Sequence, residues 1–215
     1  MRSMFDQQLK TLNEEMLYMG GLCEDTIQQT IEALMSGDVK KARDLNNMMS
    51  QLTQQERSIE NICLKLLMQQ QPVARDLRTI SSSLKMVTDM ERIGIQACEI
   101  AEIIAAGNVV RATDKVDFQE LSDEVSHMVQ MAMMAYDKKN LDLADEVIKY
   151  DDVVDKLFCD IRGDLIKQLK DDTNDAECFI DMLMIDKYFE RIGDHAVNIA
   201  RWVKFSITGE IQIVE

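Results

Sequence analysis

Apolar residues recur at steps of three and four along most of the chain, which is the spacing of a buried stripe on an α-helix. One such stripe begins at Phe5 and continues to Leu34. The clearest stripe lies near the C-terminus, with Met182, Ile185, Phe189, Ile192, Ala196, Ile199 and Val203. An unbroken alternation of threes and fours is typical of coiled-coil-like packing in a helical bundle.

Caps and breaks divide these stripes into six expected helices. The helices cover about residues 3–36, 38–70, 72–107, 116–139, 140–171 and 174–203. Gly37 and Gly107 can end helices, while Asp38 and Asn140 can cap the ones that follow. Pro72 can open the third helix, where a missing N–H costs nothing. With one proline, eight glycines and 5% aromatic residues in 215, the composition favours long helices over strands.

One pattern occurs twice. The run Glu91-Arg92-Ile93-Gly94 reappears as Glu190-Arg191-Ile192-Gly193, and the apolar stripe around each run also matches. The polar stretch from Arg111 to Lys115 separates the two halves. We therefore expect an all-α fold of two tandem, pseudo-symmetric three-helix bundles, formed by residues 1–110 and 111–215.

The repeated glycine needs a physical reason. Glycine inside a helix costs about 1 kcal/mol relative to alanine, yet Gly94 and Gly193 stand at the same place in both copies. A tight helix–helix crossing is one explanation. Room for a ligand beside the neighbouring carboxylates is the other.

Acidic residues form two rows in the second half. Glu190 and Asp194 lie four apart and so share a helix face, which Asp186 extends by one turn. Asp151 and Asp155 form a similar pair on the preceding helix. If the helices are antiparallel neighbours, the carboxylates converge and repel one another unless a cation intervenes. Oxygen-only ligands suit a hard divalent cation or an iron or zinc cluster, whereas a solvated acidic face is the alternative.

The charge excludes several classes of function. A formal net charge of −15 repels nucleic acid and anionic lipid, and it suits cations or a basic partner surface. There is no apolar signal core and no apolar run of about 18 residues, so we expect a cytoplasmic protein without membrane insertion.

The five scattered cysteines are expected to be buried thiols in a reducing compartment. No motif of nucleophilic, phosphate-cradling or metalloprotease chemistry occurs, so we expect no catalytic or cofactor-binding residues and no enzyme.

At its motifs the chain resembles the PhoU family of phosphate-signalling regulators. The residues that carry the resemblance are Gln71-Pro72-Val73-Ala74-Arg75-Asp76-Leu77-Arg78, Asp89-Met90-Glu91-Arg92-Ile93-Gly94 and Glu190-Arg191-Ile192-Gly193-Asp194-His195-Ala196. The resemblance implies a cytoplasmic protein, often a homodimer, built from two three-helix bundles. It further implies a negative regulator of phosphate uptake and of the phosphate-starvation response. Its partners would be a phosphate ABC transporter ATPase subunit and a phosphate sensor histidine kinase.

The resemblance also implies metal ligands. The family carries Asp/Glu-x-x-x-Asp motifs in each repeat, and the second repeat keeps them as Asp151 with Asp155 and Glu190 with Asp194. These four residues are therefore the predicted ligands of a divalent, iron or zinc cation.

The first repeat departs from that pattern. Glu91 is followed one turn later by Ile95, and alignment of the middle helices puts Met49 and Thr53 where carboxylates should stand. These residues cannot replace carboxylates around a hard cation. We therefore expect at most one good metal site, in the second half.

Two other functions stay open. A metal-storing or redox-active helical carboxylate protein would need paired ExxH motifs, whereas Glu124 to His127 is a single copy. The second is an accessory regulator of a sodium-coupled phosphate transporter. The neighbouring genes would distinguish it from a regulator of a phosphate ABC transporter, because an ABC transporter cluster would support the latter.

Overall fold

The computed structural model describes residues 2–69, 72–109, 116–171 and 175–210. Within these ranges the chain forms seven helices and no strand. They are α1 (Arg2–Ser36), α2 (Val39–Asp44), α3 (Asn46–Gln69), α4 (Ala74–Ala106), α5 (Gln119–Lys138), α6 (Leu141–Asp171) and α7 (Ala176–Thr208). The expected all-α class with six long helices is confirmed, and α2 is an additional short helix.

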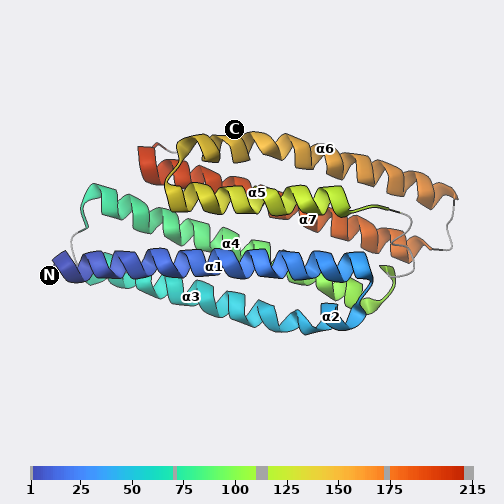
Figure 1. The fold of residues 1–215 in the computed structure, drawn as a ribbon, viewed down its shortest axis with the longest axis horizontal. Coiled ribbons are helices and arrows are strands. Elements are labelled where there is room, and N and C mark those ends of the chain that lie inside the picture. The colour runs from blue at the N-terminus through green and yellow to red at the C-terminus, as the bar shows by residue number, and fades with distance from the viewer. Residues whose placement is uncertain (1, 70–71, 110–115, 172–174, 211–215) are drawn as a thin grey trace.

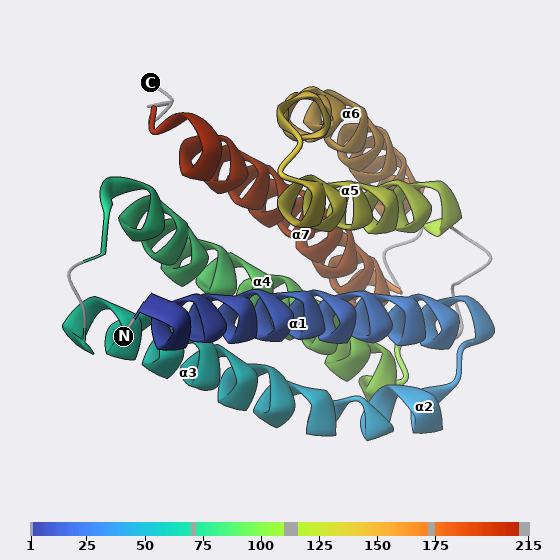
Figure 2. The same ribbon diagram turned by 60° about the vertical axis from the view of Figure 1, so that its left-hand side comes forward.

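The helices form two bundles side by side (Figure 1). In the first, α1, α3 and α4 pack on one another, and α2 lies against α4; in the second, α5, α6 and α7 pack together. The bundles meet mainly where α4 crosses α7, and α1 also lies along α5 (Figure 2). The predicted boundary at residues 110 and 111 and the stretch from Arg111 to Lys115 lie outside the described residues.

The expected second helix is broken in two. Leu45 lies between α2 and α3, and its carbonyl accepts hydrogen bonds from the Met48 amide at 2.9 Å and from the Cys98 thiol at 3.7 Å. The asparagines Asn46 and Asn47 follow at once, and asparagine side chains compete for backbone hydrogen bonds inside helices. The sequence prediction of one continuous helix was wrong for this reason.

Most predicted helix ends are confirmed. Asp38 caps α2 by accepting hydrogen bonds from the amides of Lys40 and Lys41, both at 3.0 Å. Asn140 does the same for α6, with the Asp142 amide at 2.9 Å. Pro72, however, precedes α4 by two residues instead of opening it.

The predicted seams are the core of both bundles. Every apolar position named in the C-terminal stripe is at most 1% exposed, and the matching stripe on α4 is equally buried: Met86, Met90, Ile93, Ala97, Ile100 and Ile104. Four of the five cysteines are buried free thiols, as expected, whereas Cys159 is exposed on α6 and contradicts that expectation. The Cys159 sulfur lies 4.0 Å from a guanidinium nitrogen of Arg162, one turn further along α6.

The two repeated glycines lie at helix crossings of different tightness. A Cβ on Gly94 would lie 2.5 Å and 2.6 Å from the two δ-carbons of Leu52, which is fully buried on α3. A Cβ on Gly193 would lie 3.3 Å from Cγ1 of Val154 on α6 and 3.9 Å from Oδ1 of Asp151. The crossing explanation therefore holds for Gly94, and Gly193 lies beside both an apolar neighbour and a carboxylate.

This difference predicts opposite effects of the same substitution. Gly94→Ala must displace Leu52, and overpacking costs roughly 1–3 kcal/mol, against a gain of about 1 kcal/mol in helix propensity. In Gly193→Ala, the Val154 side chain has to move by only a few tenths of an ångström. The gain in helix propensity is therefore expected to balance or exceed the cost of this displacement. Urea unfolding should therefore show a lower free energy of unfolding for Gly94→Ala than for Gly193→Ala. Equal values in the two variants would contradict the packing difference.

Candidate functional site

The four predicted ligands come from α6 and α7, which run antiparallel beside each other (Figure 1). Gly193 lets the α6 backbone approach closely enough that Asp151 lies next to α7. Burial, and after it the charges of Asp155 and Asp194, together raise the pKa of Asp151 to about 6. The structure thus brings carboxylates of both rows into one electrostatic cluster.

Asp194 belongs to the same cluster. Burial is the largest cause that raises the pKa of Asp194, and the charge of Glu190 is the next largest. Asp155 raises the pKa further by a smaller amount, whereas the charge of Lys187 lowers it. Asp151 and Asp194 therefore each stand in the negative field of neighbouring carboxylates, which a bound cation would relieve. The donor chemistry of the cluster fits a hard cation.

The side chains are not gathered into a coordination sphere. Among the described residues, no three His, Cys, Asp or Glu side chains lie close enough together to hold a metal ion. Glu190 instead accepts a hydrogen bond from the ammonium group of Lys187 at 2.5 Å, and that ammonium also lies 5.2 Å from the ring centroid of Phe158. The role of the four carboxylates as metal ligands stays a prediction that requires a change of side-chain rotamers.

Asp186 extends the α7 row into the core. It is fully buried, and neither carboxyl oxygen has a hydrogen-bond partner. Burial raises the pKa of Asp186 to about 8; the charges of Arg162 and Lys187 oppose the rise and Glu190 adds to it. Sequence spacing placed Asp186 in the row, but its burial depends on the packing of α6 against α7.

The first repeat places different chemistry at the equivalent crossing. Leu52 faces Gly94 as Val154 faces Gly193, so Thr53 on α3 stands where Asp155 stands on α6. The Thr53 hydroxyl donates a hydrogen bond to Oε1 of Glu91 at 2.7 Å. The alignment that put a threonine in the place of a carboxylate is therefore supported by the packing.

Glu56 is a neighbour of Glu91 that sequence reasoning missed. Its pKa is raised by burial first, then by the charges of Glu91 and Glu60, and by a hydrogen bond with Glu91. The spacing of Glu56 and Glu60 on α3 could have indicated an acidic row in the first half. Alignment with the second repeat did not indicate this acidic row, because the residue equivalent to Glu56 in the second repeat is Phe158.

A polar network joins the two bundles where α4 crosses α7. Nδ1 of His195 lies 2.8 Å from Oδ1 of Asp89, which also accepts a hydrogen bond from Asn198 at 3.3 Å. Asn198 in turn accepts one from Arg201 at 3.3 Å. The sequence left open whether His195 is a ligand or fills a groove; the structure places it between the repeats, in contact with Asp89.

A groove of about 410 Å³ lies over this network. Its lining includes Arg92 and Arg191 from the two copies of the repeated motif, together with Asp151 and Asp194 from the carboxylate cluster. The carboxylate cluster is thus open to the interface between the bundles. Sequence reasoning did not predict this groove, because its walls come from residues about a hundred positions apart.

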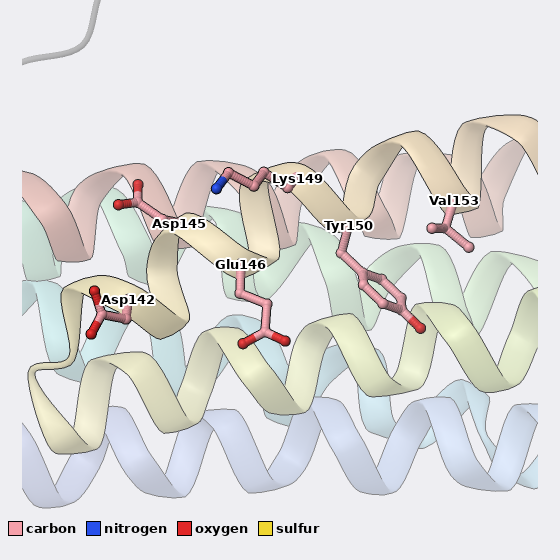
Figure 3. Close-up of a pocket in the computed structure, with 6 residues that line it drawn as sticks. All are labelled: Asp142, Asp145, Glu146, Lys149, Tyr150 and Val153. Atoms are coloured by element: carbon pink, nitrogen blue, oxygen red, sulfur yellow. The ribbon is translucent and has the colours of Figure 1, made fainter.

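A second groove, of about 370 Å³, follows α6 on the outer surface of the second bundle. Figure 3 shows its six lining residues, with Glu146 and Tyr150 extending from α6 toward α5. The Tyr150 hydroxyl donates a hydrogen bond to Glu124 at 2.5 Å, and the Tyr150 ring lies edge-on to His127 at 5.5 Å. The single ExxH pair is therefore engaged with a tyrosine, and three carboxylates and the ammonium group of Lys149 line the groove.

No helix in the described part of the chain is long and apolar enough to cross a membrane.

Comparison with known sequences gives consistent matches over almost the whole chain. The PhoU domain model matches residues 16–104 and again residues 118–203. The phosphate-specific transport system accessory protein PhoU homolog of Clostridium acetobutylicum is 35% identical over 211 residues, covering 97% of this chain and 96% of the relative. The homolog of the same name from Pseudomonas aeruginosa is 32% identical over 209 residues, covering 95% of this chain and 86% of the relative.

Solved structures agree. The crystal structure of PhoU from Pseudomonas aeruginosa superposes with a TM-score of 0.90 at 31% identity, covering 96% of this chain and 100% of the other. A phosphate transport system regulatory protein PhoU from Streptococcus pneumoniae shares the fold, with a TM-score of 0.89 at 23% identity. The duplicated fold, the repeated Glu-Arg-Ile-Gly motif and these matches lead to one conclusion: the chain belongs to the PhoU family.

Proposed function

We propose that this protein is a cytoplasmic negative regulator of phosphate uptake and of the phosphate-starvation response. It acts, as a homodimer, by binding the ATPase subunit of a phosphate ABC transporter and a phosphate sensor histidine kinase. The observation that carries the proposal is the full-length similarity to proteins named as accessory proteins of a phosphate-specific transport system.

The acidic groove on α6 supports docking to a basic partner surface. Asp142 and Glu146 are exposed there, in a chain with a net charge of −15. Complementary charge steers two proteins together and favours one partner over others. Val153, which is 41% exposed, adds an apolar contact beside the acidic side chains.

The carboxylate cluster supports a further element of the proposal, a cation held by Asp151, Asp155, Glu190 and Asp194. Burial first, and then mutual repulsion, raise the pKa values of Asp151 and Asp194, and a bound cation would relieve the repulsion. The cation would join α6 to α7 at the groove between the two bundles.

A complementation experiment tests the regulatory proposal and the acidic surface together. In a strain that lacks the gene, starvation genes should be expressed even in high phosphate, and the wild-type gene should restore repression. A gene with Asp142→Asn and Glu146→Gln should restore it less well, because the docking surface has lost two charges. Reporter expression and radiolabelled phosphate uptake are the measurements.

The matched control carries Glu120→Gln and Asp123→Asn, which remove two exposed charges from the start of α5. This control should repress as well as wild type. Unchanged uptake and starvation-gene expression in the deletion strain would refute the regulatory proposal. Equal repression by both double variants would refute the α6 docking surface.

A further inference from the structure

A third cavity lies at the end of the molecule where α1 and α4 begin and α5 and α7 end (Figures 1 and 2). It encloses about 750 Å³, a volume in the range of small-molecule binding sites. Both repeats contribute to its wall, so it forms only when the two bundles are packed together. It is separate from the carboxylate cluster and from the acidic groove on α6.

The charge of this cavity is opposite to that of the chain. Four cationic residues line it: Lys10 on α1, Arg75 and Arg78 on α4, and Lys139 directly after α5. The lining carboxylates are Asp76 and Asp137. A positive cavity in a protein with a net charge of −15 attracts anions that the rest of the surface repels.

Arg78 points to a missing partner. Its Nε is buried and has no hydrogen-bond partner, and a buried guanidinium donor left unpaired costs free energy. Its Nη1 and Cδ atoms occupy the space beside Gly209, where any Cβ would collide with them. The guanidinium therefore lies between α4 and the end of α7, with its Nε donor unpaired.

The start of α4 adds further donors. Val73, the residue before the first turn, makes no side-chain capping hydrogen bond to the first amides of α4. Helix N-termini favour oxyanions because of these amides and the helix dipole. Arg75 and Arg78 lie three apart, on one face of this first part of α4. The Pro-Val-Ala-Arg-Asp-Leu-Arg motif thus gathers several anion-binding groups at one place.

We infer that this cavity binds the phosphate group of a small phosphorylated molecule, with Arg75 and Arg78 as its principal ligands. The volume exceeds what one tetrahedral oxyanion occupies, which favours an organic phosphate such as a nucleotide. Tyr136 lies nearly buried on the cavity wall and adds a neutral hydroxyl group to it. The inference does not depend on the proposed binding of the transporter or the kinase.

Titration calorimetry on the full-length protein tests the site. ADP, ATP and inorganic phosphate are titrated separately in the presence of EDTA, so that the carboxylate cluster holds no cation. Arg75→Gln and Arg78→Gln are each expected to weaken binding at least about tenfold, as the loss of a charge-assisted hydrogen bond does. Arg78→Lys should recover part of the affinity, because it keeps the charge without the planar fork.

Arg43→Gln is the matched control, since Arg43 is an exposed arginine on α2 at the opposite end of the bundle (Figure 1). Arg75 is also exposed, so its variant reports on binding even if Arg78→Gln fails to fold. Nucleotide binding that Arg75→Gln weakens and Arg43→Gln leaves intact supports the site. Binding of inorganic phosphate alone with the same dependence also supports it and makes free phosphate the ligand. The inference is overturned if none of the three compounds binds, or if Arg75→Gln binds like wild type.

Discussion

Asp186→Asn is expected to stabilise the protein strongly at neutral pH. Asp186 is fully buried without a hydrogen-bond partner, and its pKa rises from 3.8 to about 8 on folding. At pH 7 the folded state must therefore hold a proton that the unfolded state releases. Asparagine is nearly isosteric and needs no proton, so the free energy of unfolding should rise by about 4 kcal/mol at pH 7.

The sign of the pH dependence follows from the raised pKa. Below the unfolded pKa of 3.8 both states are protonated, and the carboxyl costs nothing in proton binding. Stability falls as the pH rises from about 4 to about 8 and then levels off, because above that range both states are ionised. The difference between Asp186→Asn and wild type should therefore be small at pH 4 and largest at pH 8.

Thermal unfolding followed by circular dichroism, with EDTA present, measures this difference. At pH 7 the melting temperature of Asp186→Asn should exceed that of wild type by roughly 10 °C. Asp6→Asn, at an exposed position of α1, is the control and should melt like wild type at every pH. A melting temperature of Asp186→Asn that is unchanged or lower at pH 8 would show that Asp186 finds a partner for its charge.

Asp151→Asn and Glu190→Gln are each expected to weaken cation binding about a hundredfold or more. Each removes one negative charge from the cluster between α6 and α7, and such a charge near a dication is worth several kcal/mol at the effective dielectric of a protein. Competition between the protein and a chromogenic chelator for Mn²⁺ or Zn²⁺ measures the affinity. The melting temperature without metal should stay close to that of wild type, or rise, because one source of repulsion is gone.

Glu91→Gln is the matched control from the first repeat. Glu91 occupies the position equivalent to Glu190, but Thr53 and Ile95 stand where the second repeat has aspartates, and the neighbouring carboxylate is Glu56. Its removal should leave cation affinity unchanged. If Glu91→Gln weakens binding as much as Glu190→Gln does, the chemical difference between the repeats is refuted.

The fold could be predicted from the sequence because its main determinants are local. The apolar spacing on α7 and the caps at Asp38 and Asn140 specify helices without reference to distant residues. The two copies of Glu-Arg-Ile-Gly then showed that one arrangement occurs twice. The break at Leu45 has a local signal in Asn46 and Asn47, but its position also depends on a contact with Cys98 on another helix.

The candidate site was predictable only in part. Spacing placed Glu190 and Asp194 on one face of a helix, but the facing of α6 and α7 rested on an assumption about packing. The burial of Asp186 and the contact of His195 with Asp89 depend on how helices meet, which no local pattern specifies. The cavity around Arg78 was not predicted for the same reason, because its wall combines the beginning of two helices with the end of two others.

We propose that the two copies of the bundle share a fold, while only the second holds a cation. Anomalous X-ray diffraction from crystals soaked in Mn²⁺ tests it directly, because the anomalous map locates the metal without reference to activity. We expect a peak between α6 and α7, beside Asp151 and Asp194, and none at the equivalent place beside Thr53 and Glu91. A peak of equal height at the first-repeat position, or a peak there alone, would contradict the claim.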